Sequence, residues 1–94
     1  MNSFSGELNM GKYVLLFESG NYIILDNEVK LIEYLHGMVV QGVREEVKIV
    51  KCDAIVDFTR KVEKALDIAL TIAEGTVNEK TAKFITELLF EVGG

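Results

Sequence analysis

"VVQGVREEVKIVKCDAIVDF", residues 39–58, decides how this chain folds. Gly42 stands where a left-handed residue commonly ends a helix, so we expect the preceding helix to stop there. The following "REEVKIVKC" alternates, with Val47 and Ile49 on one face, and this alternation predicts a strand. Asp53 can accept the free amide protons of a first helical turn, so we expect a second helix to begin beside it. Helix, strand and helix therefore follow one another without a linker.

The N-terminal part of the chain predicts a β-hairpin. "KYVLLFESGNYIILD" contains two runs of β-branched and aromatic residues on either side of the turn sequence "ESGN", so we expect strands over 13–18 and 21–25. Both faces of each strand are largely apolar, which indicates that the hairpin is covered on at least one side. Residues 1–11 are rich in Asn, Ser and Gly and are predicted to be a flexible tail, which leaves 12–94 as a single α+β domain.

A helix with two apolar faces is predicted between this hairpin and Gly42. Asp26 and Asn27 are both suited to cap its first turn. Its two apolar faces consist of Val29, Ile32, Leu35 and Val39, and of Leu31, Tyr34 and Met38. The second face either packs inside the fold or binds a partner. Gly37 lies within this helix, and a glycine retained there indicates close approach of another backbone.

The C-terminal part predicts a long helix and one further element. The helical stripe consists of Ile55, Phe58, Val62, Leu66, Ala69 and Ile72. Gly75 is expected to end this helix. Residues 80–92 fit two different structures. As a strand they align Phe84, Leu88, Phe90 and Val92. As a helix capped by Asn78 they align Ala82, Ile85, Leu88, Leu89 and Val92, and both structures stay open.

Size and composition are those of one small globular domain. The chain has 94 residues, of which 49% are apolar and 27% charged, an ordinary balance for a folded protein. The order of elements predicts an α+β fold, a small two-layer sandwich with helices packed on one face of a mixed sheet. The apolar runs are far shorter than the roughly 20 residues of a membrane helix, and a lone cysteine favours a reducing compartment. We therefore expect a soluble, cytoplasmic protein.

Positive charge is confined to the middle of an acidic chain. The formal net charge is −5, which argues against binding a polyanion. Residues 1–43 and 65–94 each hold two lysines against five acids, whereas residues 44–64 hold six basic side chains against five acids. Those six are Arg44, Lys48, Lys51, Arg60, Lys61 and Lys64. Any phosphate contact is expected among them, and the alternative is that they form a solvated strand edge and helix surface.

The sequence lacks the residue patterns typical of an enzyme. His36 is the only histidine and has no serine or cysteine nucleophile at a recognisable spacing. The position of Cys52 at a strand end is explained by packing. Capping and solubility explain the paired carboxylates, which are Asp26 with Glu28 and Glu45 with Glu46. Because we find no phosphate-binding glycine loop, zinc-ligand spacing or catalytic triad order, we expect a non-enzymatic protein without metal or cofactor.

A series of short motifs extends from the end of the first predicted helix into the second. It reads Gln41-Gly42-Val43, Glu45, Val47, Lys51, Ala54-Ile55 and Val62-Glu63. This series resembles the Alba family of small archaeal chromatin- and RNA-associated proteins, and "NYIILDNEVKLIEYL" resembles that family's first strand and helix. The resemblance covers about residues 21–74. The paired-lysine loop and the basic C-terminal hairpin of the family have no counterpart here, which affects the nucleic-acid inference more than the fold.

The resemblance implies a dimer that binds the backbone of DNA or RNA without reading bases. The residues predicted to bind nucleic acid are Arg44, Lys48, Lys51, Arg60 and Lys61. The residues predicted to form the dimer interface are Leu31, Tyr34, Met38, Phe84 and Phe90. Two other functions fit the sequence: an acidic protein-interaction subunit on the same scaffold that does not bind nucleic acid, and a regulatory domain that binds a small ligand. Nucleic-acid binding requires the cations to lie together on an exposed ridge, free of neutralising acids.

Overall fold

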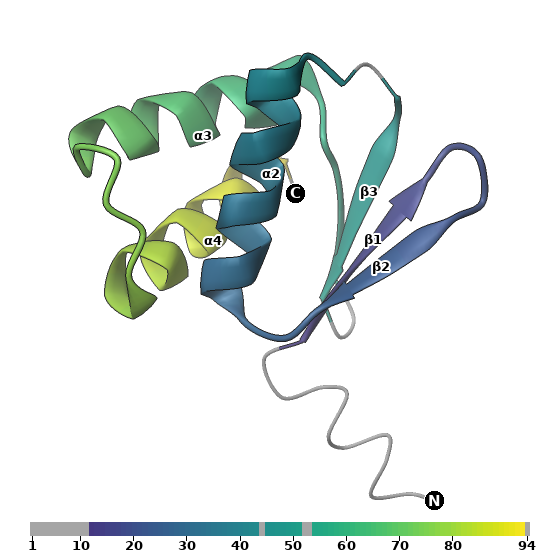
Figure 1. The fold of residues 1–94 in the computed structure, drawn as a ribbon, viewed down its shortest axis with the longest axis horizontal. Helices are drawn as coiled ribbons and strands as arrows, with labels where there is room; N and C mark the ends of the chain where they lie inside the picture. Colours follow the sequence, from purple (N-terminus) through teal and green to yellow (C-terminus); the bar gives the residue numbers. More distant parts are fainter. Residues whose placement is uncertain (1–11, 44, 52–53, 94) are drawn as a thin grey trace, which may run out of the picture.

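The computed structural model describes residues 12–43, 45–51 and 54–93 and shows a sheet with three helices on one side of it (Figure 1). The predicted tail, residues 1–11, lies outside the described residues. The elements are β1 (Tyr13–Phe17), β2 (Tyr22–Leu25), α2 (Glu28–Gln41), β3 (Val47–Lys51), β4 (Ala54–Asp57), α3 (Arg60–Ile72) and α4 (Glu79–Gly93). The predicted α+β fold of two layers is confirmed.

The sheet has the strand order β2-β1-β3-β4 and is antiparallel throughout. The prediction of a mixed sheet is therefore wrong. Helix α2 connects β2 to β3, and these two strands do run in the same direction. They are not neighbours, because β1 lies between them and pairs with both, as shown by the partners Leu15↔Ile23 and Leu15↔Ile49. Because β1, the hairpin partner of β2, separates the two strands that run in the same direction, the sheet contains no parallel pair.

The second predicted helix begins later than expected. Residues Ala54–Asp57 form strand β4, which pairs with β3, and helix α3 starts only at Arg60. Thr59 caps α3, since its side-chain hydroxyl accepts a hydrogen bond from the Val62 amide at 3.4 Å. Residues 54–58 satisfy both helical spacing and strand alternation. They form a strand because β3 offers a backbone edge with which they pair, and this pairing buries Val56 against the helices.

The ends of α2 and the nature of α4 follow local rules. Asn27 caps α2 by accepting a hydrogen bond from the Lys30 amide at 3.0 Å, and Gly42 ends it with a φ of 73°, both as predicted. Of the two structures open for residues 80–92, the helix is confirmed. Asn78 caps it through a hydrogen bond from the Thr81 amide at 2.9 Å.

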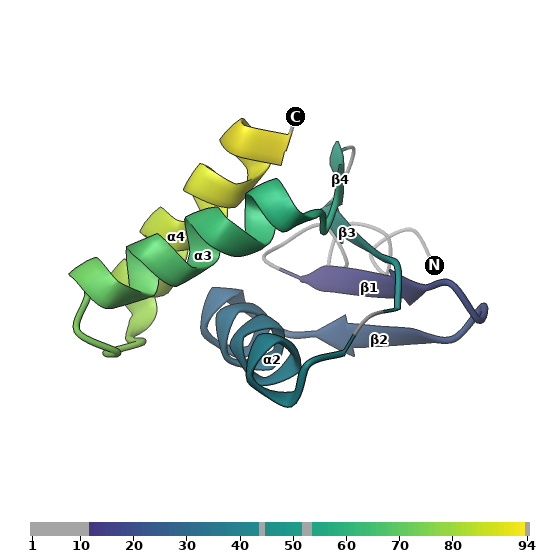
Figure 2. The ribbon, with the colours of Figure 1, turned by 90° about the horizontal axis from the view of Figure 1, so that it is seen from above.

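The core lies between the inner face of the sheet and the three helices (Figure 2). Fully buried side chains from the sheet are Tyr13, Leu15, Ile49 and Val56, and those from the helices include Leu31, Ile32, Leu35, Val62, Leu66, Ile85 and Leu89. Each such side chain stabilises the fold by roughly 1.5–3 kcal/mol relative to an exposed position. No helix in the described part of the chain combines the length and apolarity that crossing a lipid bilayer requires.

Candidate interaction surface

The face of the sheet turned away from the helices carries a continuous row of aliphatic side chains. The registers Val14↔Ile24, Val14↔Val50 and Val50↔Ile55 place these four residues side by side, one from each strand. Ile24 is 49% exposed and Ile55 is 61% exposed, and the two valines between them are partly buried by their neighbours. This aliphatic row crosses about 14 Å of sheet, since adjacent strands lie about 4.8 Å apart.

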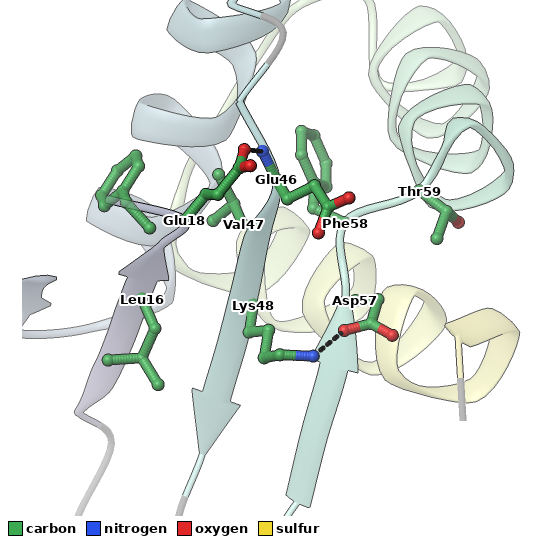
Figure 3. A pocket seen from close by; sticks show the side chains of 9 residues that line it. Leu16, Glu18, Glu46, Val47, Lys48, Asp57, Phe58 and Thr59 are labelled. Atoms are coloured by element: carbon green, nitrogen blue, oxygen red, sulfur yellow. Dashed lines mark hydrogen bonds and ion pairs between the residues drawn. The ribbon is translucent and has the colours of Figure 1, made fainter. Parts of the chain in front are cut away.

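A second row runs beside the aliphatic row and is of mixed character. It consists of Tyr22, Leu16, Lys48 and Asp57, in the order of the strands. Tyr22 is 63% exposed, and Leu16 is also exposed. Lys48 Nζ lies 2.8 Å from Asp57 Oδ1 in the neighbouring strand, and this hydrogen bond and the charge of Asp57 raise the pKa of the lysine (Figure 3). The one cation in the mixed row is therefore neutralised on the surface itself.

Six of the eight side chains in the two rows are apolar, although no element in the described part of the chain covers them. An antiparallel sheet with one solvated face normally alternates between apolar residues toward the core and polar residues toward water. Strand β1 departs from this rule, because Val14 and Leu16 face outward and Leu15 faces inward. Contiguous exposed apolar surface of this kind marks a site of interaction in a folded protein.

Charged residues mark the two ends of this face. At one end Lys12 Nζ lies 3.7 Å from Asp26 Oδ1. At the other end Glu18 and Glu46 are neighbours, because the Glu18 amide donates to the Glu46 carbonyl at 2.9 Å. Both of these glutamates are exposed. Among the residues that the structure describes, the face therefore has a charge-balanced end and an acidic end.

A hollow of about 630 Å³ lies at the acidic end (Figure 3). Its lining consists of Leu16, Phe17, Glu18, Glu46, Val47, Lys48, Asp57, Phe58 and Thr59. Its charges are three carboxylates and one lysine, and that lysine is paired with Asp57. Within residues 12–43, 45–51 and 54–93, no group of three His, Cys, Asp or Glu side chains gathers in a way that could hold a metal ion.

The four predicted nucleic-acid-binding cations in the described part of the chain do not form one ridge. Lys48 is paired with Asp57 on the outer face, whereas Lys51 has its Nζ 5.9 Å from the ring centroid of Phe90 on α4. Arg60 and Lys61 stand at the start of α3 and line a second hollow, of about 530 Å³. The other residues around that hollow are Val39, Glu63, Lys64 and Asp67. Arg44 lies outside the described residues.

The predicted dimer interface is only partly on the surface. Leu31 and Met38 are buried in the core of the chain's own fold, so their assignment to an interface is corrected. Tyr34 and Phe84 are exposed on α2 and α4. Phe90 is half-buried, with its ring centroid 6.4 Å from that of Tyr13. For the second apolar face of α2, the sequence left open whether it packs inside the fold or binds a partner. The two-layer fold itself buries most of this face.

Sequence reasoning missed the residues of the outer sheet face. The signal was present for Tyr22 and Ile24, because both faces of the hairpin strands are apolar and helices cover only one of them. Ile55 gave no such signal, since it fitted the stripe of a helix that in fact begins five residues later. Its exposure follows from the pairing of β4 with β3.

Comparison with protein-family models, curated proteins and solved structures finds no match to this chain. The resemblance to the Alba family stays a prediction.

Proposed function

We propose that the chain is a non-enzymatic assembly module that forms a homodimer by packing the uncovered face of its sheet against the same face of a second copy. The observation that carries this proposal is the aliphatic row from Ile24 through Val14 and Val50 to Ile55, which crosses all four strands and which no element among residues 12–43, 45–51 and 54–93 covers. Removing these side chains from water stabilises the complex in proportion to the apolar area buried.

A second copy suits this face better than an unrelated partner does. Two sheets of the same shape stack with about 10 Å between them and with their strands rotated by about 30°. Lys48 and Asp57 are the only charged side chains in the two rows, and they cancel, so the two rows carry no net charge within a chain of net charge −5. Two acidic molecules can approach each other there with little repulsion, and a two-fold axis lets the same patch serve both copies.

Sedimentation velocity over a range of concentrations tests the proposal. The wild-type chain is expected to sediment as a dimer, and Ile55→Lys, which places a charge in the aliphatic row, is expected to sediment as a monomer. The matched control is Ile72→Lys on α3, because Ile72 is 75% exposed and lies in the helical layer. The control should leave the dimer intact. A wild-type chain that is monomeric at every concentration, or a control that dissociates equally, would contradict the proposal.

Binding of a nucleic-acid backbone is a second candidate, favoured by the second hollow. Arg60, Lys61 and Lys64 line it together, and no carboxylate in the described part of the chain forms an ion pair with them. They would contact phosphates without reading bases, as the resemblance to the Alba family implies. Glu63 and Asp67 beside the hollow weaken this candidate relative to the first.

A gel shift at low salt against duplex DNA and structured RNA tests this second candidate. Lys61→Glu combined with Lys64→Glu should abolish binding, because two phosphate contacts become repulsive. Lys83→Glu, at an exposed position on α4, is the matched control and should bind as the wild type does. Absence of any shift for the wild-type chain at low salt would remove the candidate.

A further inference from the structure

The outward positions of β1 form a pattern that is complementary to itself. Every second residue of β1 faces outward, which gives Val14 and Leu16. Partly exposed Lys12 precedes the strand, and exposed Glu18 stands in the turn after it, where its Oε1 accepts a weak hydrogen bond from the Glu46 amide at 3.5 Å. A cation stands at one end, a carboxylate at the other, and two aliphatic side chains lie between them. Because β1 is one of the two inner strands of the sheet, this pattern runs through the middle of the exposed face.

Two identical faces can stack about a two-fold axis in two ways. An axis parallel to the strands superimposes like ends, so that Glu18 and Glu46 of one copy face the same two glutamates of the other. An axis perpendicular to the strands superimposes opposite ends, so that the glutamates of one copy face the end that contains Lys12. The first arrangement concentrates four carboxylates at one edge of a partly desolvated interface, and the second places opposite charges together.

We infer, resting on the dimer proposed above, that the two copies stack with opposite ends in contact and that Lys12 of each copy pairs with Glu18 of the other. The axis then passes between Val14 and Leu16, so that Leu16 of one copy packs on Val14 of the other. The aliphatic row of each copy covers the mixed row of its partner. Tyr22 lies over Ile24, and the Lys48–Asp57 pair of each copy lies against Val50 and Ile55 of the other.

The contacts that Lys12 makes within one copy leave it available for this exchange. Its Nζ is 3.7 Å from Asp26, and the side chain of Asp26 is largely exposed and also 3.7 Å from Lys30 Nζ. Exposed pairs at such distances contribute little to stability. Lys30 can neutralise Asp26 when Lys12 turns toward the partner's glutamate.

Charge reversal tests the orientation. The dimer dissociation constant is measured by sedimentation equilibrium at low ionic strength for the wild type, Lys12→Glu, Glu18→Lys and the double variant. Each single variant is expected to weaken the dimer by about tenfold, because the symmetry repeats the like-charge contact twice. The double variant restores both pairs with their signs exchanged and is expected to bind within about threefold of the wild type.

Lys83→Glu is the matched control, because it reverses the charge of an exposed lysine on α4, in the helical layer, that has no contact with Asp26. It should leave the dissociation constant unchanged. If both single variants weaken the dimer and the double variant does not recover, or if neither single variant has an effect, the orientation is overturned while the dimer through the sheet face stands. A wild-type chain that stays monomeric overturns the dimer itself. Thermal unfolding of each variant shows whether it remains folded.

Discussion

The hydroxyl of Tyr13 is tied to a carboxylate at the edge of the core. It donates a hydrogen bond to Glu28 Oε2 at 2.7 Å, and the tyrosine is almost completely buried. Burial raises the pKa of Tyr13 above its ordinary value of 10.0, and the hydrogen bond and negative charge of Glu28 raise it further. The folded state therefore favours the neutral phenol over the phenolate more strongly than the unfolded state does.

Tyr13→Phe is expected to lower the free energy of unfolding at pH 7 by about 1.5–3 kcal/mol, because it removes a hydrogen bond to a charged group. Since the folded-state pKa is raised, the contribution of Tyr13 is complete below the unfolded pKa of about 10 and is lost as the pH rises above it. The stability difference between wild type and variant should thus shrink above pH 10 in urea titrations. Tyr22→Phe, at an exposed position, is the control, and a difference independent of pH would contradict the assignment.

The hydroxyl of Thr86 is buried in α4, and the described part of the chain offers it no hydrogen-bond partner. A buried polar group without a partner costs about 1–3 kcal/mol. Thr86→Val replaces it with a methyl group of similar size and should raise the free energy of unfolding by about 1 kcal/mol in urea titrations. Thr71→Val should raise it by less or lower it, since the exposed Thr71 hydroxyl donates to the Asp67 carbonyl at 2.9 Å. A lower stability for Thr86→Val would show that the hydroxyl is satisfied.

At the scale of the element, two glycines within helices have opposite roles. The expectation of close backbone approach at Gly37 is wrong, because a Cβ there would have no neighbouring atom within 4 Å. At Gly93, near the end of α4, a Cβ would overlap Val56 Cγ1 and lie 3.0 Å from Val62 Cγ2. The close contact that a helical glycine permits therefore lies at the junction of α4 with β4 and α3.

Alanine substitutions should separate these two glycines. Gly37→Ala is expected to stabilise the chain by about 1 kcal/mol, because alanine loses less backbone entropy in a helix. Gly93→Ala is expected to destabilise it, since the overlap with the stiff side chain of Val56 exceeds the gain in helix propensity. Chemical denaturation of both variants measures the two effects. Equal shifts in the same direction would show that the end of α4 does not pack as described.

At the scale of the whole molecule, assembly through the sheet face links stability to concentration. Anything that binds only the folded state stabilises it by mass action, and a second copy is such a ligand. The midpoint of thermal unfolding should therefore rise with protein concentration for the wild type. It should be independent of concentration for Ile55→Lys, whereas Ile72→Lys should behave as the wild type. A wild-type midpoint that stays constant over a hundredfold range of concentration would argue against association.

Local chemistry determined much of the fold from the sequence. The hairpin turn, the Asn27 cap, the Gly42 stop and the alternation of β3 each depend on a few neighbouring residues, and the structure confirms all of them. The α+β class followed from their order. For residues 80–92 the sequence left helix and strand open. The structure has the helix, α4, which packs against the other helices and the sheet.

Only the tertiary structure decided the position of β4 and the character of the surface. Residues 54–58 fit a strand and a helix equally well, and the unpaired edge of β3 selected the strand, which turned Ile55 outward. The same pairing set Lys48 beside Asp57, so a cation predicted to meet phosphate is neutralised within the chain. Spacing along a chain specifies which side chains share a face of one element. It does not specify which strand lies next to it, and that neighbour determines both the exposed row and the charge it carries.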